Sequence, residues 1–103
     1  LSGSGPAYVF LFIEAMQQAA AELGFTPEQG RQLAIETVQG AAALAAQSSD
    51  PASVLRERVT SKGGTTEAAL NKMAEMGVKA GIIAGVKAAE ARGQELGKLL
   101  GAA

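Results

Sequence analysis

Residues 56–70 read RERVTSKGGTTEAAL, and the interpretation of the whole chain depends on this stretch. Its two ends have the composition of helices, whereas its centre combines two glycines with serine and threonine. Because Gly63 and Gly64 lack a Cβ atom, the backbone there can turn sharply and lie close to a ligand. We therefore expect two helices joined by a turn at the glycines.

The same turn is a candidate site for an anion. Thr65 or Thr66 is expected to cap the second helix, whose first N–H groups have no partner within the helix. A helix N-terminus carries partial positive charge and attracts a carboxylate or phosphate. Hydroxyl groups that can donate or accept hydrogen bonds are supplied by Thr60, Ser61, Thr65 and Thr66. An ordinary capped turn that binds nothing has the same spacing, so the residues alone leave both interpretations open.

Composition restricts the class of protein. The chain of 103 residues is 48% hydrophobic and 18% charged, which is typical of one folded domain. Its formal net charge is -1 and its nine Lys and Arg are scattered, so a nucleic-acid partner is not expected. The absence of cysteine and histidine excludes disulfides, argues against a metal site and favours a cytoplasmic location.

The apolar content is rich in alanine, and only 4% of the residues are aromatic. Because alanine buries little area, the core of one subunit would be thin for a chain of this length. We therefore expect the chain to complete its core with a partner.

The first expected helix begins with Ser4 as its cap and Pro6 in its first turn, and Gly24 ends it. Every residue from Ala7 to Ile13 is apolar, so this helix needs cover on nearly every side and is expected to be buried or to lie in an interface. It is too short and too interrupted by polar residues to span a membrane.

The next helix is expected to start at Pro27, because Thr26 and Gln29 have the spacing of a capping box. It is expected to run to about Gln47, and further helices are expected over residues 51–59, 66–76 and from a break at Gly77 towards residue 100. No alternation of apolar and polar residues indicates a strand, so the fold is expected to be all-α.

Gly77, Gly81 and Gly85 are spaced four residues apart and share one face of the last helix. Glycine inside a helix costs roughly 1 kcal/mol relative to alanine, so this register favours the close approach of another backbone. Small residues that only relieve local crowding are the alternative.

Catalytic groups are hard to assign from the residues, because without histidine or cysteine no pair of nucleophile and base can be argued. Glu14, inside the apolar helix, is the carboxylate that we expect to be the most buried, in a structural contact rather than in catalysis. Lys62 could attract an anion, although an exposed loop lysine is the commoner case. The residues therefore predict a helical, oligomeric domain with one candidate anion-binding turn.

Two motifs resemble those of the pyrroline-5-carboxylate reductases. Residues 59–66, VTSKGGTT, preceded by Pro51 and Leu55, are similar to the family signature. Residues 1–8, LSGSGPAY, resemble the family's linker into its C-terminal domain, and the resemblance covers essentially the whole chain. Lys62 stands where many members have proline, and the segment 51–55 is one residue longer than the commonest version. Neither difference removes a hydroxyl or a glycine from the loop.

The resemblance implies an oxidoreductase of proline biosynthesis, which reduces 1-pyrroline-5-carboxylate, a cyclic imino acid, to L-proline with NADPH or NADH. In this family an N-terminal Rossmann domain binds the nucleotide. A helical C-terminal domain of the 6-phosphogluconate-dehydrogenase-like type intertwines with its twin in a homodimer, and several members form decamers. Residues 1–103 resemble this dimerisation and substrate-binding domain alone. The chain is therefore expected to lack the Rossmann domain and to be inactive by itself.

Carried over to this sequence, the resemblance places the substrate site in the glycine turn. Thr66 is the implied catalytic residue, whose hydroxyl would hydrogen-bond the ring nitrogen while hydride reaches the adjacent carbon. Pro6 would lie near the nicotinamide. The implied substrate-binding residues, which would hold the carboxylate, are Ser61, Gly63, Gly64, Thr65 and Thr66.

Two other functions remain in competition. A non-catalytic helical dimerisation module would keep the fold without binding a ligand, but pure packing would not need hydroxyls at Ser61 and Thr66 beside paired glycines. The C-terminal domain of another NAD(P)-dependent dehydrogenase would also be helical, but the GGTT loop at residues 63–66 argues against it.

Overall fold

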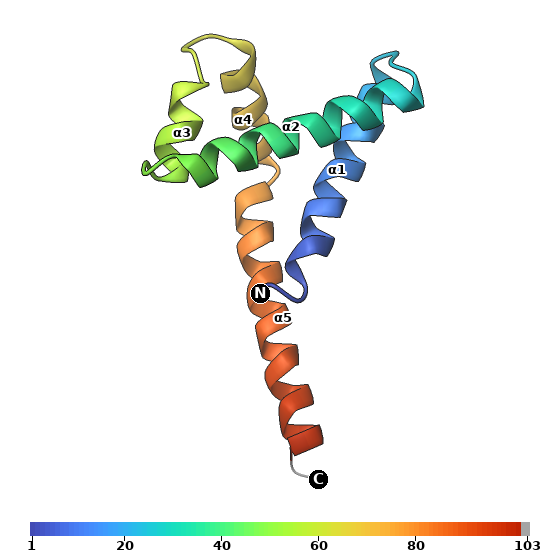
Figure 1. The fold of residues 1–103 in the computed structure, drawn as a ribbon, viewed down its shortest axis with the longest axis vertical. Coiled ribbons are helices and arrows are strands. Elements are labelled where there is room, and N and C mark those ends of the chain that lie inside the picture. The colour runs from blue at the N-terminus through green and yellow to red at the C-terminus, as the bar shows by residue number, and fades with distance from the viewer. Residues whose placement is uncertain (102–103) are drawn as a thin grey trace.

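The computed structural model describes residues 1–101 and consists of helices joined by short loops (Figure 1). No strand is present among the described residues, so the prediction of an all-α fold is confirmed. The predicted helix boundaries lie close to the observed ones. The helices are α1 (Gly5–Glu22), α2 (Pro27–Gln47), α3 (Ala52–Arg58), α4 (Thr65–Glu75) and α5 (Val78–Gly101).

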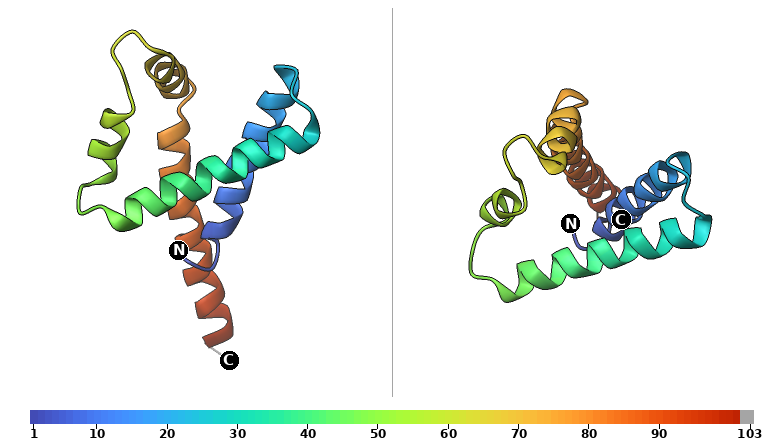
Figure 2. Two further views of the ribbon diagram at one scale, coloured as in Figure 1. Left: turned by 45° about the horizontal axis from the view of Figure 1, so that its top comes forward. Right: turned by 90° about the horizontal axis from the view of Figure 1, so that it is seen from above.

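The helices do not gather around one centre. α1 and α2 form a hairpin, whereas α4 leads into the long α5, whose second half projects away from the other helices (Figures 1 and 2). The Cα radius of gyration is 16.9 Å and the extents are 55 × 33 × 29 Å. A compact domain of about 100 residues has a radius of gyration of about 13 Å. The domain is therefore open on several sides.

The core of the single chain is very small. Among residues 1–100 only Gly30 and Ala34, both on α2, are buried. Gly30 lets α2 approach α1 closely, because a Cβ atom added there would lie 3.2 Å from the Cβ atom of Ala20. The expected thin core is confirmed, and the sequence pattern had not indicated Gly30 as the point of close contact.

The apolar run of α1 is uncovered. The exposed fractions of Val9, Phe10, Leu11 and Phe12 are 44%, 66%, 64% and 46%, and no residue of α1 is buried. Glu14 is exposed as well, so the prediction that it is the most buried carboxylate is wrong. This helix was expected to be buried or to lie in an interface, and the other helices of the described residues leave its apolar run uncovered.

The glycines of the last helix have different roles. Gly77 adopts a positive φ of 71° directly after α4, which confirms the predicted break between two helices. A Cβ atom added at Gly81 or Gly85 would meet no other atom within 4 Å. Among the described residues no other backbone approaches that face, so the predicted close approach is not made within this part of the chain.

Two helix starts illustrate how local signals work. At α2 the predicted capping box is confirmed: the Thr26 hydroxyl accepts from the Gln29 N–H at 3.2 Å, and Gln29 Oε1 accepts from the Thr26 N–H at 2.9 Å. At α1 the predicted N-cap position of Ser4 is confirmed, but its side chain makes no capping hydrogen bond. Its hydroxyl is hydrogen-bonded to the phenol group of Tyr8 instead.

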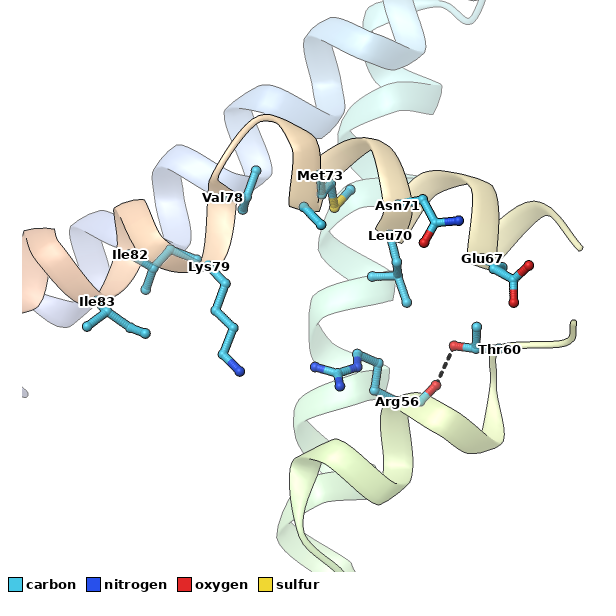
Figure 3. A pocket seen from close by; sticks show the side chains of 11 residues that line it. Arg56, Thr60, Glu67, Leu70, Asn71, Met73, Val78, Lys79, Ile82 and Ile83 are labelled. Atoms are coloured by element: carbon cyan, nitrogen blue, oxygen red, sulfur yellow. Dashed lines mark hydrogen bonds between the residues drawn. The ribbon is translucent and has the colours of Figure 1, made fainter. Parts of the chain in front are cut away.

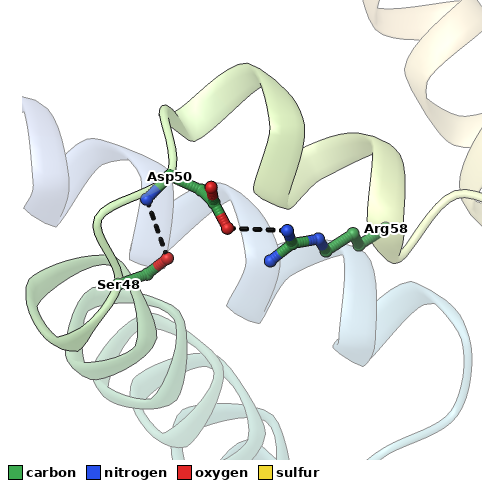
Figure 4. Close-up of polar contacts among 3 residues, drawn as sticks. All are labelled: Ser48, Asp50 and Arg58. Carbon is green, nitrogen blue, oxygen red and sulfur yellow. Dashed lines mark hydrogen bonds and ion pairs between the residues drawn. The ribbon is translucent and has the colours of Figure 1, made fainter.

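The short connection between α2 and α3 is held by polar contacts (Figure 4). The Asp50 N–H donates to Ser48 Oγ at 3.0 Å, and the Asp50 carboxylate lies 2.6 Å from the Arg58 guanidinium. The side chains of Arg58 and Asp50 are 59% and 40% exposed, so this ion pair contributes at most about 1 kcal/mol. It links the two ends of α3, which leads directly into the glycine turn.

No helix in the described part of the chain combines the length and the apolar character that crossing a bilayer requires.

The uncovered apolar surface predicts that the chain associates with itself in solution. Light scattering over a range of concentrations should give a dimer or a larger assembly. Phe10→Glu should shift the chain towards monomer or unfolded chain, because a charge cannot be buried there without a partner. Gln39→Glu, on an exposed polar position of α2, is the control and should leave the mass unchanged. A wild-type chain that stays a well-folded monomer at every concentration would contradict this prediction.

The capping box of α2 predicts the effect of a second pair of substitutions. Thr26→Ala should lower the free energy of unfolding by about 1 kcal/mol, because the Gln29 N–H loses its acceptor. Thr37→Ala should leave stability nearly unchanged, since Thr37 bonds only to the Leu33 carbonyl within the exposed helix. Denaturant unfolding at one fixed protein concentration measures both. Equal effects of the two substitutions would rule out a special role for the cap.

Candidate functional site

The turn between α3 and α4 lies at one end of the molecule, at the top of Figure 1. Gly63 has a φ of 77°, a conformation that side-chain-bearing residues rarely adopt. The Gly64 N–H donates to the Ser61 carbonyl at 3.0 Å and closes the turn. A Cβ atom added at Gly64 would lie 3.2 Å from that same carbonyl oxygen. Gly63 is therefore favoured by its positive φ, and Gly64 is favoured because a side chain there would crowd the Ser61 carbonyl.

The start of α4 differs from the prediction. Thr65 is the first helical residue, and Gly64 occupies the N-cap position with the extended angles φ −90° and ψ −176°. The prediction that Thr65 or Thr66 caps the helix is wrong, because both lie inside its first turn. Since glycine has no side chain, no side-chain cap is made at this helix.

The two glycine N–H groups are already hydrogen-bonded within the chain. The Gly64 N–H donates to Ser61, and the Gly63 N–H donates to the carboxylate of Glu67 at 3.1 Å. In this state the glycines shape the turn rather than offer donors to a ligand. Glu67 was not among the predicted site residues, although an acidic residue at the third position of a helix is a known signal for contacts of this kind.

The donors that remain available belong to the first turn of α4. The first intrahelical bond runs from the Ala68 N–H to the Gly64 carbonyl at 3.2 Å. The N–H groups of Thr65, Thr66 and Glu67 precede it and find no acceptor among the described residues. These three groups lie at the positive end of the helix dipole, where an anion is favoured.

Three of the four hydroxyls indicated by the sequence are also available. The Thr60 hydroxyl donates to the Arg56 carbonyl at 2.6 Å, at the end of α3, and is therefore not free for a ligand (Figure 3). No hydrogen bond within the described residues involves the hydroxyls of Ser61, Thr65 or Thr66. Thr66 is partly buried at the turn, whereas Ser61 and Thr65 are exposed.

An open groove of about 780 Å³ adjoins the turn and runs between α3, α4 and α5 (Figure 3). Thr60 and Glu67 lie at the end nearest the turn, and Arg56 and Lys79 bring positive charges to its wall. The apolar part of the wall is formed by Leu70, Met73, Ala74, Val78, Ile82 and Ile83.

The chain brings the predicted substrate residues together but not the predicted cofactor contact. Pro6 is exposed in the first turn of α1, and the N-terminal end of α1 lies well below the α3–α4 turn in the view of Figure 1. Gly3 and Gly5 follow no strand, and a Cβ atom added at either would meet nothing within 4 Å. The described residues therefore do not form a cradle for a dinucleotide. They also contain no group of three or more carboxylates that could hold a metal ion.

Comparison with known proteins identifies relatives over nearly the whole chain. Residues 1–96 match the family model described as pyrroline-5-carboxylate reductase dimerisation. The pyrroline-5-carboxylate reductase of Pseudomonas aeruginosa is 43% identical over 101 residues, covering 98% of this chain. The Synechocystis protein of the same name is 42% identical over 98 residues, covering 95% of this chain. In both cases the chain spans only 37% of the relative's length.

Solved structures agree with the sequence relatives. The pyrroline-5-carboxylate reductase of Coxiella burnetii superposes with a TM-score of 0.88 at 45% identity, covering 93% of this chain and 36% of that one. The NADP-bound pyrroline carboxylate reductase of Plasmodium falciparum superposes with a TM-score of 0.90 at 31% identity, covering 93% of this chain and 37% of that one. The sequence match and the shared helical fold lead to one conclusion: this chain belongs to the pyrroline-5-carboxylate reductase dimerisation family.

Proposed function

We propose that this chain provides the dimer interface and the substrate-binding turn of a reductase that converts 1-pyrroline-5-carboxylate to L-proline with NADPH or NADH. The observation that carries the proposal is the uncapped start of α4, where the N–H groups of residues 65–67 lie beside three unused hydroxyls. Membership of the family supports the choice of an imino acid as the ligand.

The substrate carboxylate takes the position of the missing helix cap. It accepts hydrogen bonds from the N–H groups of Thr65 and Thr66, and the exposed hydroxyl of Ser61 supplies a further donor. Hydrogen bonds to a charged group are worth about 1.5–3 kcal/mol each. Gly63 and Gly64 contribute by shaping the turn, because their own N–H groups are already bonded within the chain.

Thr66 is the residue that we assign to the chemistry. With the carboxylate at the start of α4, the Thr66 hydroxyl hydrogen-bonds the ring nitrogen and orients the imine. A protonated imine is a better hydride acceptor than a neutral one, so positioning and one polar contact are sufficient. The nicotinamide nucleotide supplies the hydride. Since the described residues form no cradle for it, we place its binding mainly outside this chain, with Pro6 as the contact from this domain.

A second copy of the chain covers the exposed apolar surfaces and forms a homodimer. The apolar run of α1 and the open face at Gly81 and Gly85 are the surfaces that need such cover. The groove beside the turn opens onto the same α5, so the substrate site lies next to the interface.

Substitutions at two neighbouring threonines test the proposed chemistry in the full-length protein. Thr66→Val should lower kcat about ten- to hundredfold, because the hydrogen bond to the ring nitrogen is lost. Thr65→Val keeps the backbone N–H that binds the carboxylate and removes a hydroxyl to which the proposal gives no role, so kcat and KM should both stay within a fewfold of the wild type. The rate of NAD(P)H oxidation with 1-pyrroline-5-carboxylate measures both.

Two outcomes would contradict the proposal. Equal kcat values for the wild type and Thr66→Val would remove Thr66 from the chemistry. A folded full-length protein that neither binds nor reduces the imine would favour the non-catalytic dimerisation module.

A further inference from the structure

Glu67 is the acidic side chain of the turn, and the proposed reaction does not use it. It is partly buried in the first turn of α4, and one carboxylate oxygen accepts from the Gly63 N–H at 3.1 Å. It forms no ion pair with Arg56 or Lys79, the two basic residues that line the same groove. A negative charge beside a proposed carboxylate site weakens binding by repulsion, so Glu67 must have another role at this position.

The start of α2 indicates this role, because Gln29 there occupies the same helical position as Glu67 in α4. There, Gln29 at the third helical position bonds back to the N–H of Thr26, and Thr26 bonds forward to the N–H of Gln29. Glu67 stands at the corresponding position of α4 and also bonds back, but to the N–H of Gly63, one residue before the N-cap Gly64. The forward bond is missing because Gly64 has no side chain. The α4 start therefore keeps a backward contact displaced by one residue from that of a capping box, and it lacks the forward bond from a cap side chain.

The hydrogen bond between Glu67 and Gly63 stabilises the backbone at a glycine with a positive φ. Gly63 holds a φ of 77°, and glycine loses more conformational freedom on ordering than any other residue. The Glu67 carboxylate fixes the N–H of this glycine and thereby the path of the chain from Ser61 into α4. Removing the acceptor would free the turn before a ligand arrives.

Resting on the proposed function, we infer that Glu67 is a positioning residue with two opposing effects. As a hydrogen-bond acceptor it holds the turn in its ligand-binding shape. As a negative charge in the same helical turn it repels the ligand carboxylate and weakens the binding of ligands that carry this carboxylate relative to ligands that lack it. Glutamine keeps the first effect and removes the second, whereas alanine removes both.

The experiment compares Glu67→Gln and Glu67→Ala with the wild-type full-length protein, using L-proline and L-prolinamide, which lacks the carboxylate, as probes. Calorimetry should show that Glu67→Ala weakens L-proline binding about tenfold or more, because the turn must be ordered on binding. Glu67→Gln should bind L-proline severalfold more tightly than the wild type and should not tighten the binding of L-prolinamide, which has no carboxylate for Glu67 to repel. Hydrogen exchange at the Gly63 amide should be faster in Glu67→Ala and unchanged in Glu67→Gln.

Glu28→Gln is the matched control, because it removes a carboxylate from the first turn of α2. It should change neither the affinity for the two ligands nor hydrogen exchange at the Gly63 amide. The inference is overturned if Glu67→Ala retains wild-type L-proline affinity, or if Glu67→Gln behaves like Glu67→Ala. A wild-type protein that binds no L-proline would refute the proposed function instead. Faster exchange at Gly63 in Glu67→Ala would then still support the contact that holds the turn.

Discussion

Covering the apolar surface of α1 is the constraint on which the rest of the structure depends. Among residues 1–100 the single chain buries two small residues of α2 and leaves Phe10 and Leu11 about two-thirds exposed. At about 25 cal/mol per Å² of apolar area removed from water, burial of that size cannot offset the entropy cost of ordering the chain. The missing burial must come from contacts that this chain does not make with itself, which is why a domain of this family is a dimerisation domain.

A different constraint shapes the turn at residues 61–67. The chain leaves α3, reverses at Gly63 and enters α4 without a side-chain cap. Three N–H groups at the start of α4 have no acceptor among the described residues, which costs stability whenever water is excluded from them. The capping box at Thr26 shows that the same chain can satisfy donors at a helix start with side chains. The uncapped start of α4 therefore lowers the stability of the chain locally and leaves N–H groups that an anion could accept from.

Local signals in the sequence were enough to predict the helices. Gly24, Pro27 and the Thr26–Gln29 pair act through backbone angles and bonds within a few residues, so their effect does not depend on distant packing. The errors occurred where the answer depends on neighbours in space. Glu14 was expected to be buried because its neighbours are apolar, but burial requires another helix against it. The close contact at Gly30 was missed for the same reason, because nothing in α2 alone indicates where α1 crosses it.

The candidate site was predictable as a location and not in its details. The two glycines and the hydroxyls around them marked the turn, but the assignment of donors followed from coordinates alone. The Gly63 N–H is taken by Glu67, and the Gly64 N–H by Ser61, so among the described residues the donors left at the turn are the N–H groups that begin α4. The groove that Thr60 and Glu67 line starts beside this turn and runs along α5. Hydrogen bonds to a carboxylate strengthen when water is excluded, so a partner chain that covered this end of the groove would also strengthen binding of an anion at the turn.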